Sequence, residues 1–275
     1  MEKIFYKSEY FDAKQTLFCG QVFRFRPFKE GYLVFSADKA CYIETKGDVT
    51  TVESEDADYF ENYFDLAADY SEINRFALSS EYPFIRKAAE YAKGIRILNQ
   101  NAEEAFYSFV ISQNNMIPRI KAIIERTCVS LGEEREIMGE EYYSFPESRK
   151  LALCDEDFFV KAGYGYRAAY MSELSKAASE RRIDFAALGK LPTKELKKAL
   201  CSLKGVGPKV ADCVSLFGYH RTDSFPVDTW IEKVYREDMN GTLTDRKKIS
   251  LSLSEEFGDK SGYVQQYVFY YKREN

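Results

Sequence analysis

The sequence predicts an α+β protein in which an antiparallel β-sheet near the N-terminus is followed by a mainly helical body. Three observations support this fold class. About the first sixty residues contain short β-rich runs, one of which alternates with the two-residue period typical of strands. From Asp56 onward, apolar residues recur at the three- and four-residue spacing of amphipathic helices. Two of the later helices are separated only by a short glycine turn.

The strands are expected in four consecutive segments. In residues 31–38, Tyr32, Val34 and Ser36 alternate with Leu33 and Phe35, which predicts a strand with two distinct faces. A hairpin turn is expected at residues 46–48, where a glycine separates two strand-like runs. The four expected segments are residues 17–28, 31–38, 40–47 and 48–54.

The helical part begins with four segments of helical period and ends with one more. The first four cover residues 59–79, 84–95, 101–113 and 118–132. The charged stretch 132–136 and the glycines Gly163 and Gly165 are expected in surface loops between helices. The last helix, at about residues 262–272, places Gln265 and Phe269 four residues apart and therefore on one face.

The composition excludes several classes of protein. The chain has 275 residues, of which 45% are hydrophobic and 30% charged, so it is neither disordered nor collagen-like. Its apolar runs are shorter than the roughly 18–20 residues that span a bilayer. The N-terminus lacks the apolar core of a signal peptide. We therefore expect a cytoplasmic protein with no membrane association.

The cysteines and the single histidine restrict the possible metal chemistry. The six cysteines are scattered, with no C-x-x-C pair, which predicts neither a zinc site nor a disulfide framework. With His220 as the only histidine, sites built on several histidines and Ser–His–Asp triads lack their residues. The sequence therefore favours chemistry without a metal or a cofactor.

Residues 191–230 carry the strongest functional signal. Leu196, Leu200 and Leu203 form an apolar stripe, and a second stripe follows the turn Gly205-Val206-Gly207, so a helix-hairpin-helix is expected at about residues 193–217. Glycines let the backbone approach a phosphate, and the free N–H groups of the turn and of the next helix can donate to it. Such a clamp holds the DNA backbone without reading its sequence.

The local charge around the hairpin also favours phosphate binding, although the chain as a whole carries a net charge of -5. An acidic average argues against nucleic-acid binding, but binding depends on the local patch. Around the hairpin, one glutamate, Glu195, stands among five lysines, which are Lys194, Lys197, Lys198, Lys204 and Lys209. A glycine turn in a plain helical bundle remains the alternative interpretation.

Lys209 and Asp228 are the candidate catalytic residues. Lys209 lies in the first turn of the second hairpin helix, where the helix dipole disfavours a positive charge, so a purely structural role is the less natural one. Cys213 follows one turn later and can line the same pocket wall. Asp228 precedes a helix as a capping residue, and a rigidly held carboxylate can also stabilise a cation that develops on a sugar.

The hairpin segment resembles the helix-hairpin-helix DNA glycosylases. Their hallmark is similar to LKGVGPKVADC followed by FPVD, and a lysine at the position of Lys209 marks the branch that also cleaves the DNA strand. Over most of the chain, the resemblance is to the eukaryotic-type 8-oxoguanine DNA glycosylase/AP lyases. It implies a twisted N-terminal sheet against a two-part helical body, which we divide into residues 1–96, with flanking helices, and 97–275.

The resemblance also implies a base pocket. CGQVFRF is similar to the family's G-Q-S-F-R motif, whose glycine carbonyl, here that of Gly20, accepts the N7 proton of 8-oxoguanine. GYVQQYVF resembles the pocket helix, which assigns Gln265 to the Watson–Crick edge of the base. Phe269 and Cys213 then stack on the two faces of the base.

Two further motifs resemble the family's contacts with the opposite strand. SQNNMIPRI assigns Asn114, beside Asn115, to the gap left by the flipped base and Arg119 to the orphaned cytosine. GYRAAY assigns Tyr166 to the wedge that opens the duplex and Arg167 to a second contact with the cytosine. The implied partner is double-stranded DNA that contains 8-oxoguanine, bound by a monomer.

The sequence departs from the family pattern at three positions. Val22 replaces a serine, Met116 replaces an asparagine, and Trp230 stands where eukaryotic members carry a histidine near the phosphate of the flipped nucleotide. These departures affect the expected phosphate contacts, and Trp230 becomes a candidate DNA contact. The four closely spaced cysteines that hold an iron–sulfur cluster in related glycosylases do not occur, so no cluster is expected.

The implied function is excision of 8-oxoguanine, preferentially opposite cytosine, with strand cleavage by β-elimination through a lysine Schiff base. Two alternatives remain at this point. One is a related glycosylase for other oxidised or alkylated bases, against which Lys209 counts, because alkyl-base members generally lack that lysine. The other is a non-enzymatic DNA-binding module that uses the hairpin for phosphates alone.

Overall fold

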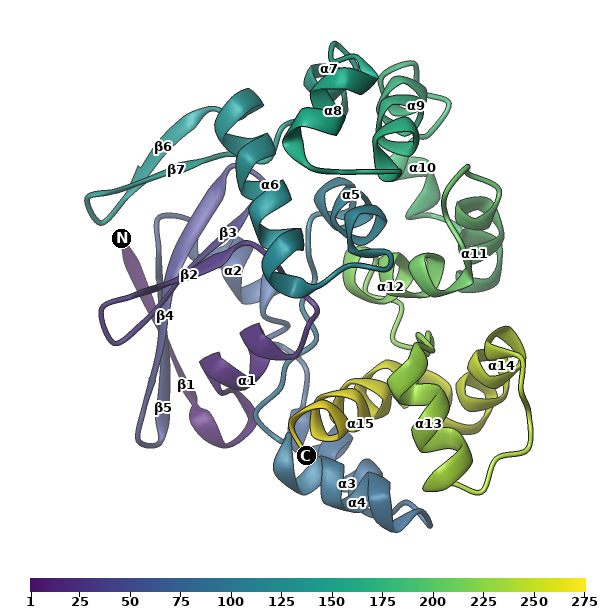
Figure 1. Ribbon diagram of the computed structural model, residues 1–275. Coiled ribbons are helices and arrows are strands. Elements are labelled where there is room, and N and C mark those ends of the chain that lie inside the picture. Colours follow the sequence, from purple (N-terminus) through teal and green to yellow (C-terminus); the bar gives the residue numbers. More distant parts are fainter.

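Five antiparallel strands form the N-terminal sheet of the computed structural model, which describes all 275 residues (Figure 1). The spatial order is β1-β5-β4-β3-β2. The predicted turn at residues 46–48 is confirmed, because Gly47 has a φ of +55° between the paired residues Lys46 and Val49. The strands are β1 (Glu2–Lys7), β2 (Phe25–Phe28), β3 (Gly31–Ser36), β4 (Lys39–Lys46) and β5 (Val49–Ser54).

The start of the sheet differs from the prediction in two ways. Leu17 and Phe18 were expected in a strand but end helix α1 (Ala13–Phe18), whose first turn is capped by Asp12. Strand β1 was not predicted at all, although it pairs along its whole length with β5. Most β1 side chains are exposed or half-buried, so its apolar signal is weak in the sequence.

Both faces of strand β3 are buried, which the predicted alternation did not indicate. Val34 packs on the side of α1 and α2 (Ala57–Tyr63). Leu33 and Phe35 pack against a second hairpin, formed by β6 (Glu134–Ile137) and β7 (Glu140–Tyr143), where Phe35 stacks on Tyr142 at 5.0 Å. The stretch 132–136 is at the surface, as predicted, but Glu134–Glu136 belong to strand β6 rather than to a loop. Such short charged strands carry few apolar residues and are hard to recognise in the sequence.

The helices form two parts with separate cores, as the resemblance implied. The first part is α5 (Ala102–Ser112), α6 (Ile117–Leu131), α7 (Ser148–Leu151), α8 (Glu156–Ala162), α9 (Arg167–Ser179), α10 (Phe185–Leu188), α11 (Thr193–Cys201) and α12 (Pro208–Gly218). The second is α3 (Tyr70–Leu78), α4 (Pro83–Tyr91), α13 (Thr229–Glu237), α14 (Arg246–Phe257) and α15 (Ser261–Glu274). None of these helices is long and apolar enough to cross a membrane.

Helices α3 and α4 join the second part although they precede it by more than a hundred residues. Figure 1 shows α15 beside them, and Phe84 of α4 packs edge-to-face on Tyr271 of α15 at 5.2 Å. Residues 1–96 thus contribute to the core of the sheet and also to a core shared with the C-terminal helices. The predicted division after residue 96 does not mark the limit of a core.

A buried ion pair fixes the sheet to the first helical part. Arg24, which follows the Gly20 turn, contacts Glu104 of α5 at 3.1 Å, and the Glu104 carboxylate also accepts from the backbone N–H of Ala37. Burial raises the pKa of Glu104, and the charge of Arg24 opposes that rise. Because an unpaired buried charge is costly, this pair holds the Gly20 segment in place relative to α5.

Candidate functional site

The glycine turn between α11 and α12 forms the predicted hairpin. Gly205 has a φ of +79°, and a Cβ there would lie 2.6 Å from the ring of Tyr170, so only glycine fits. Val206 is buried and anchors the turn in the core. The N–H groups of Gly207, Lys209 and Val210 have no acceptor within the protein. The start of α12 therefore presents free donors, as an anion-binding turn requires.

Lys209 lies at this same end of α12. Its ammonium is 5.7 Å from the ring centroid of Phe109, and no carboxylate forms an ion pair with it. Cys213, one turn further on, is buried, which raises the pKa of its thiol, whereas the charge of Lys209 and a contact with it oppose the rise. The charge of Asp228 also acts on Cys213. Lys209 thus lies against Cys213, and Asp228 is near enough for its charge to act on the same thiol.

Asp228 is the N-cap of α13. One carboxylate oxygen, Oδ1, accepts from the backbone N–H groups of Trp230 and Ile231 at 3.0 and 2.9 Å. The other oxygen has no donor within the protein, so it is free to face a ligand. The two cap bonds hold the half-buried carboxylate in one orientation. Trp230 follows with 42% of its surface exposed, beside this cap.

Two of the predicted base-pocket residues, Gly20 and Phe269, meet where α15 reaches the Gly20 turn. Gly20 has a φ of +86°, and a Cβ there would lie 3.2 Å from the ring of Phe269. Gln266 donates to the carbonyl of Cys19 at 2.5 Å, which ties the helix to the turn. Gln265 is 5% exposed, and its buried Oε1 has no hydrogen-bond partner. This oxygen is one of ten buried side-chain polar atoms in the structure without a hydrogen-bond partner, and its place beside the Gly20 turn would let it accept a hydrogen bond from a ligand.

Sequence reasoning missed Arg273, which supports this pocket. Its guanidinium lies 5.5 Å from the ring centroid of Phe269 and donates to the carbonyl of Phe18, just before Gly20. A second nitrogen, Nη1, is buried without a partner. The available signal was the spacing, since residue 273 is one turn after Phe269 and two turns after Gln265 on α15.

The residues expected at the opposite strand gather at two neighbouring loops. Asn114 is exposed in the loop between α5 and α6, with a φ of +45°. The hydroxyl of Tyr166, 55% exposed at the start of α9, donates to the carbonyl of Gln113 at 3.3 Å. The exposed Arg119 reaches the same place by donating to the carbonyl of Gly163 at 3.2 Å.

Asn115 and Arg167 have internal roles in this cluster. Asn115 accepts from the backbone N–H of Met116 and donates to the carbonyl of Ile111, so its amide shapes the loop. Arg167 is only 3% exposed and donates to the carbonyls of Gln113 and Asn114, at 2.8 and 2.9 Å. Burial lowers the pKa of Arg167. In this structure its guanidinium therefore fixes the Asn114 loop.

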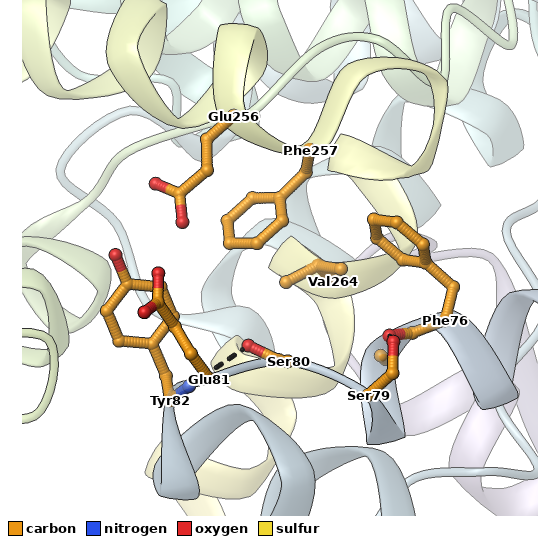
Figure 2. Close-up of a pocket in the computed structure, with 9 residues that line it drawn as sticks. Phe76, Ser79, Ser80, Glu81, Tyr82, Glu256, Phe257 and Val264 are labelled. Carbon is orange, nitrogen blue, oxygen red and sulfur yellow. Dashed lines mark hydrogen bonds between the residues drawn. The ribbon is translucent and has the colours of Figure 1, made fainter.

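A separate small pocket lies away from these residues. It has a volume of about 240 Å³ between the α3–α4 connection, α14 and α15. Figure 2 shows the carboxylates of Glu81 and Glu256 on the same side of this pocket as the ring of Tyr82. Burial raises the pKa of Glu256, and the nearby charge of Glu81 adds to the rise. No predicted site residue lines this pocket, so it is not part of the candidate site.

The hairpin with free amides and the lysine at the start of its second helix are what a helix-hairpin-helix DNA glycosylase is expected to have. Comparison with known proteins agrees. Residues 3–106 match the model of the 8-oxoguanine DNA glycosylase N-terminal domain. An 8-oxoguanine glycosylase/lyase from Clostridium acetobutylicum, whose structure holds double-stranded DNA with cytosine opposite to 8-oxoG, is 33% identical with a TM-score of 0.92. That comparison covers 100% of this chain and 98% of the clostridial one.

The chain belongs to the 8-oxoguanine DNA glycosylase family. The N-glycosylase/DNA lyase of Arabidopsis thaliana is 31% identical over 203 residues, a match that covers 70% of this chain and 55% of the plant protein. The chain thus spans just over half the length of that relative. A 3-methyladenine DNA-glycosylase from Archaeoglobus fulgidus is 18% identical with a TM-score of 0.78 over 99% of both chains, which shows a shared fold.

Proposed function

We propose that this protein excises 8-oxoguanine from double-stranded DNA and cleaves the strand at the resulting site through a Schiff base on Lys209. The observation that carries the proposal is the unpaired Lys209, held beside Cys213 and Asp228 at the phosphate-binding end of α12. A hairpin that only bound DNA would need neither this lysine nor the orphaned oxygen of Gln265. The clostridial relative supports the choice of lesion and partner.

The reaction needs a flipped nucleotide, because the sugar of a stacked nucleotide cannot reach Lys209. Extrusion costs a few kcal/mol of unstacking, which Tyr166 and Asn114 offset in part by filling the gap. Arg119 is exposed and can read the orphaned cytosine directly. Arg167 must first release the carbonyls of Gln113 and Asn114, so we assign it a second, later contact.

The chemistry then proceeds in two steps on one lysine. After the ammonium of Lys209 has given up a proton, its nitrogen attacks C1′ of the sugar, the bond from C1′ to the base breaks, and the base leaves with the bonding electrons and takes up a proton. Asp228 stabilises the positive charge that develops on the sugar. The bond from C1′ to the ring oxygen then breaks, the oxygen takes up a proton, and a Schiff base forms between C1′ and Lys209. Loss of a proton from C2′ forms a C2′–C3′ double bond and expels the 3′ phosphate with the electrons of its bond to C3′.

Borohydride trapping tests the proposal. Reduction of the Schiff base leaves a stable covalent complex, which we expect with a duplex carrying 8-oxoguanine opposite cytosine and not with an undamaged duplex. An adduct that forms instead with another oxidised base would point to a related glycosylase. Retained DNA binding with no adduct on any damaged duplex would leave a binding module or a lysine-independent glycosylase, and base release from alkylated DNA would separate those two.

Replacement of Gln265 tests the base pocket. Gln265→Leu removes the amide that we assign to the Watson–Crick edge, and we expect single-turnover excision of 8-oxoguanine to slow about tenfold, because a hydrogen bond of this kind contributes about 1–1.5 kcal/mol. The same change removes a buried oxygen that has no partner, so the melting temperature should stay the same or rise. Undiminished excision would remove Gln265 from the pocket.

A further inference from the structure

A second basic surface lies next to the hairpin, in a groove of about 840 Å³ between α11, α12 and α14. Pro208, Ala211 and Asp212 line it from α12, whereas neither Lys209 nor Cys213 does. The groove is therefore separate from the candidate catalytic residues. It shares with them only the start of α12, where the free amides lie.

The helices around the groove are held together by a buried carboxylate. Asp212 is 6% exposed, pairs with Lys197 of α11 at 2.8 Å and accepts from the hydroxyl of Ser250 of α14 at 3.0 Å. Burial raises the pKa of Asp212, and the charge of Lys197 opposes the rise. The groove is thus a fixed feature of the fold, and Lys197 is already neutralised.

Three other lysines line the groove and form no ion pair, namely Lys194, Lys198 and Lys247. Two acids that line it, Asp223 and Glu255, form no ion pair and lie towards one end. Asp223 accepts from the hydroxyl of Thr193, the first residue of α11. Glu255 is near the end of α14, which approaches the same region, because Gly262 donates to the carbonyl of Thr222.

The other end of the groove is basic and faces the hairpin turn. Lys198 lies in the second half of α11, which runs towards that turn, and Lys247 lies in the first turn of α14. The two helices meet there, since the charge of Lys247 acts on Cys201, the last residue of α11. Both lysines are exposed and present free ammonium groups beside Pro208 at the start of α12.

We propose that Lys198 and Lys247 bind phosphodiesters of the DNA strand where it leaves the hairpin amides, so that the groove extends the DNA-binding surface along one flank of the lesion. The proposal rests on the proposed function for the position of the DNA. Charge complementarity and continuity with the hairpin favour this occupant. An acidic peptide would also suit two lysines, and the experiment separates the two.

The salt dependence of binding measures such contacts directly. Each phosphate neutralised contributes about 0.9 to the slope of log K against log salt concentration. We expect Lys198→Ala and Lys247→Ala each to lower that slope by up to about 0.9, and the double variant by about twice as much. Lys14→Ala is the matched control, because Lys14 is exposed on α1 and forms no ion pair in the structure.

Two further measurements, with duplexes trimmed on either side of the lesion, show where on the DNA Lys198 and Lys247 make contact. Trimming the duplex on one flank of the lesion should abolish the difference between wild type and the lysine variants, whereas trimming the other flank should leave it. Slopes equal to those of Lys14→Ala, or a difference that survives both trimmings, would overturn the proposal and favour the peptide. The salt slopes are also measured on an undamaged duplex, where no excision is needed. If the wild type forms no covalent complex with lesion DNA, the proposed function is contradicted, but the slopes still test the contacts of Lys198 and Lys247 with DNA.

Discussion

Lys209→Gln is expected to abolish both base excision and strand cleavage while the variant still binds a lesion duplex. Glutamine keeps the length and polarity of the side chain but cannot attack C1′ or form a Schiff base. Loss of a nucleophile commonly lowers the rate by more than about 10³-fold. Single-turnover excision and borohydride trapping, with binding measured in parallel, check this expectation.

Lys204→Gln is the matched control for that variant. It removes a lysine from the same hairpin, but Lys204 is exposed and paired with Glu173 at 2.8 Å, away from Cys213 and Asp228. We expect it to form the covalent complex as the wild type does. Full excision by Lys209→Gln would overturn the assignment of the nucleophile, and equal loss in both variants would indicate a general effect of hairpin charge.

The hairpin could be predicted from the sequence because its determinants are local. Two apolar stripes, a turn with glycine where φ is positive and a proline at the first helical position all lie within about 25 residues. The same reasoning predicted the cap at Asp228, because capping joins residues two and three positions apart. The positions of the free amides and of Lys209 follow from these local rules.

Features that depend on distant residues could not be predicted in this way. Strands β6 and β7 carry few apolar residues, and their partner surface on β3 lies about a hundred positions earlier. Arg273 has no motif of its own, and its contacts with Phe18 appear only once α15 has packed on the Gly20 turn. The groove likewise requires α14 to pack beside α11, which no local pattern indicates.

Arg167 shows how a motif and a structure give different information about one residue. The motif GYRAAY resembles a segment that contacts DNA, and the sequence alone therefore places Arg167 at the cytosine. In the structure its donors are used by the loop that carries Asn114, and only 3% of the residue is exposed. Any contact of Arg167 with DNA would therefore require movement of the loop that carries Asn114.

The overall charge of -5 does not indicate the charge of the proposed DNA-binding surface around the hairpin. Two of the hairpin lysines are paired with carboxylates, Lys197 with Asp212 and Lys204 with Glu173. Lys198 and Lys209 of the hairpin and Lys247 of α14 form no ion pair and lie towards the exposed amides at the start of α12, whereas the unpaired Lys194 lies at the far end of α11. An acidic protein can thus concentrate unpaired positive charge where a phosphate backbone would pass.

Asp228→Asn separates the structural role of the aspartate from its proposed catalytic role. Asparagine caps a helix about as well as aspartate, so we expect the free energy of unfolding to change by less than about 1 kcal/mol. The negative charge that would stabilise the sugar cation is lost, and removal of a preorganised electrostatic group typically slows chemistry by about 10²–10³-fold. Thermal melts, lesion-duplex binding and single-turnover excision measure these effects separately.

The matched control is Asp245→Asn, because Asp245 caps α14 with the same type of bond, accepting from the backbone N–H of Lys248 at 2.9 Å. Both substitutions change a capping carboxylate to an amide, so they should alter stability to a similar small extent. Only Asp228 has an oxygen left free beside Lys209 and Cys213, and therefore only its replacement should slow excision. An unchanged excision rate in Asp228→Asn would reduce Asp228 to a helix cap and leave the sugar cation to be stabilised by other groups.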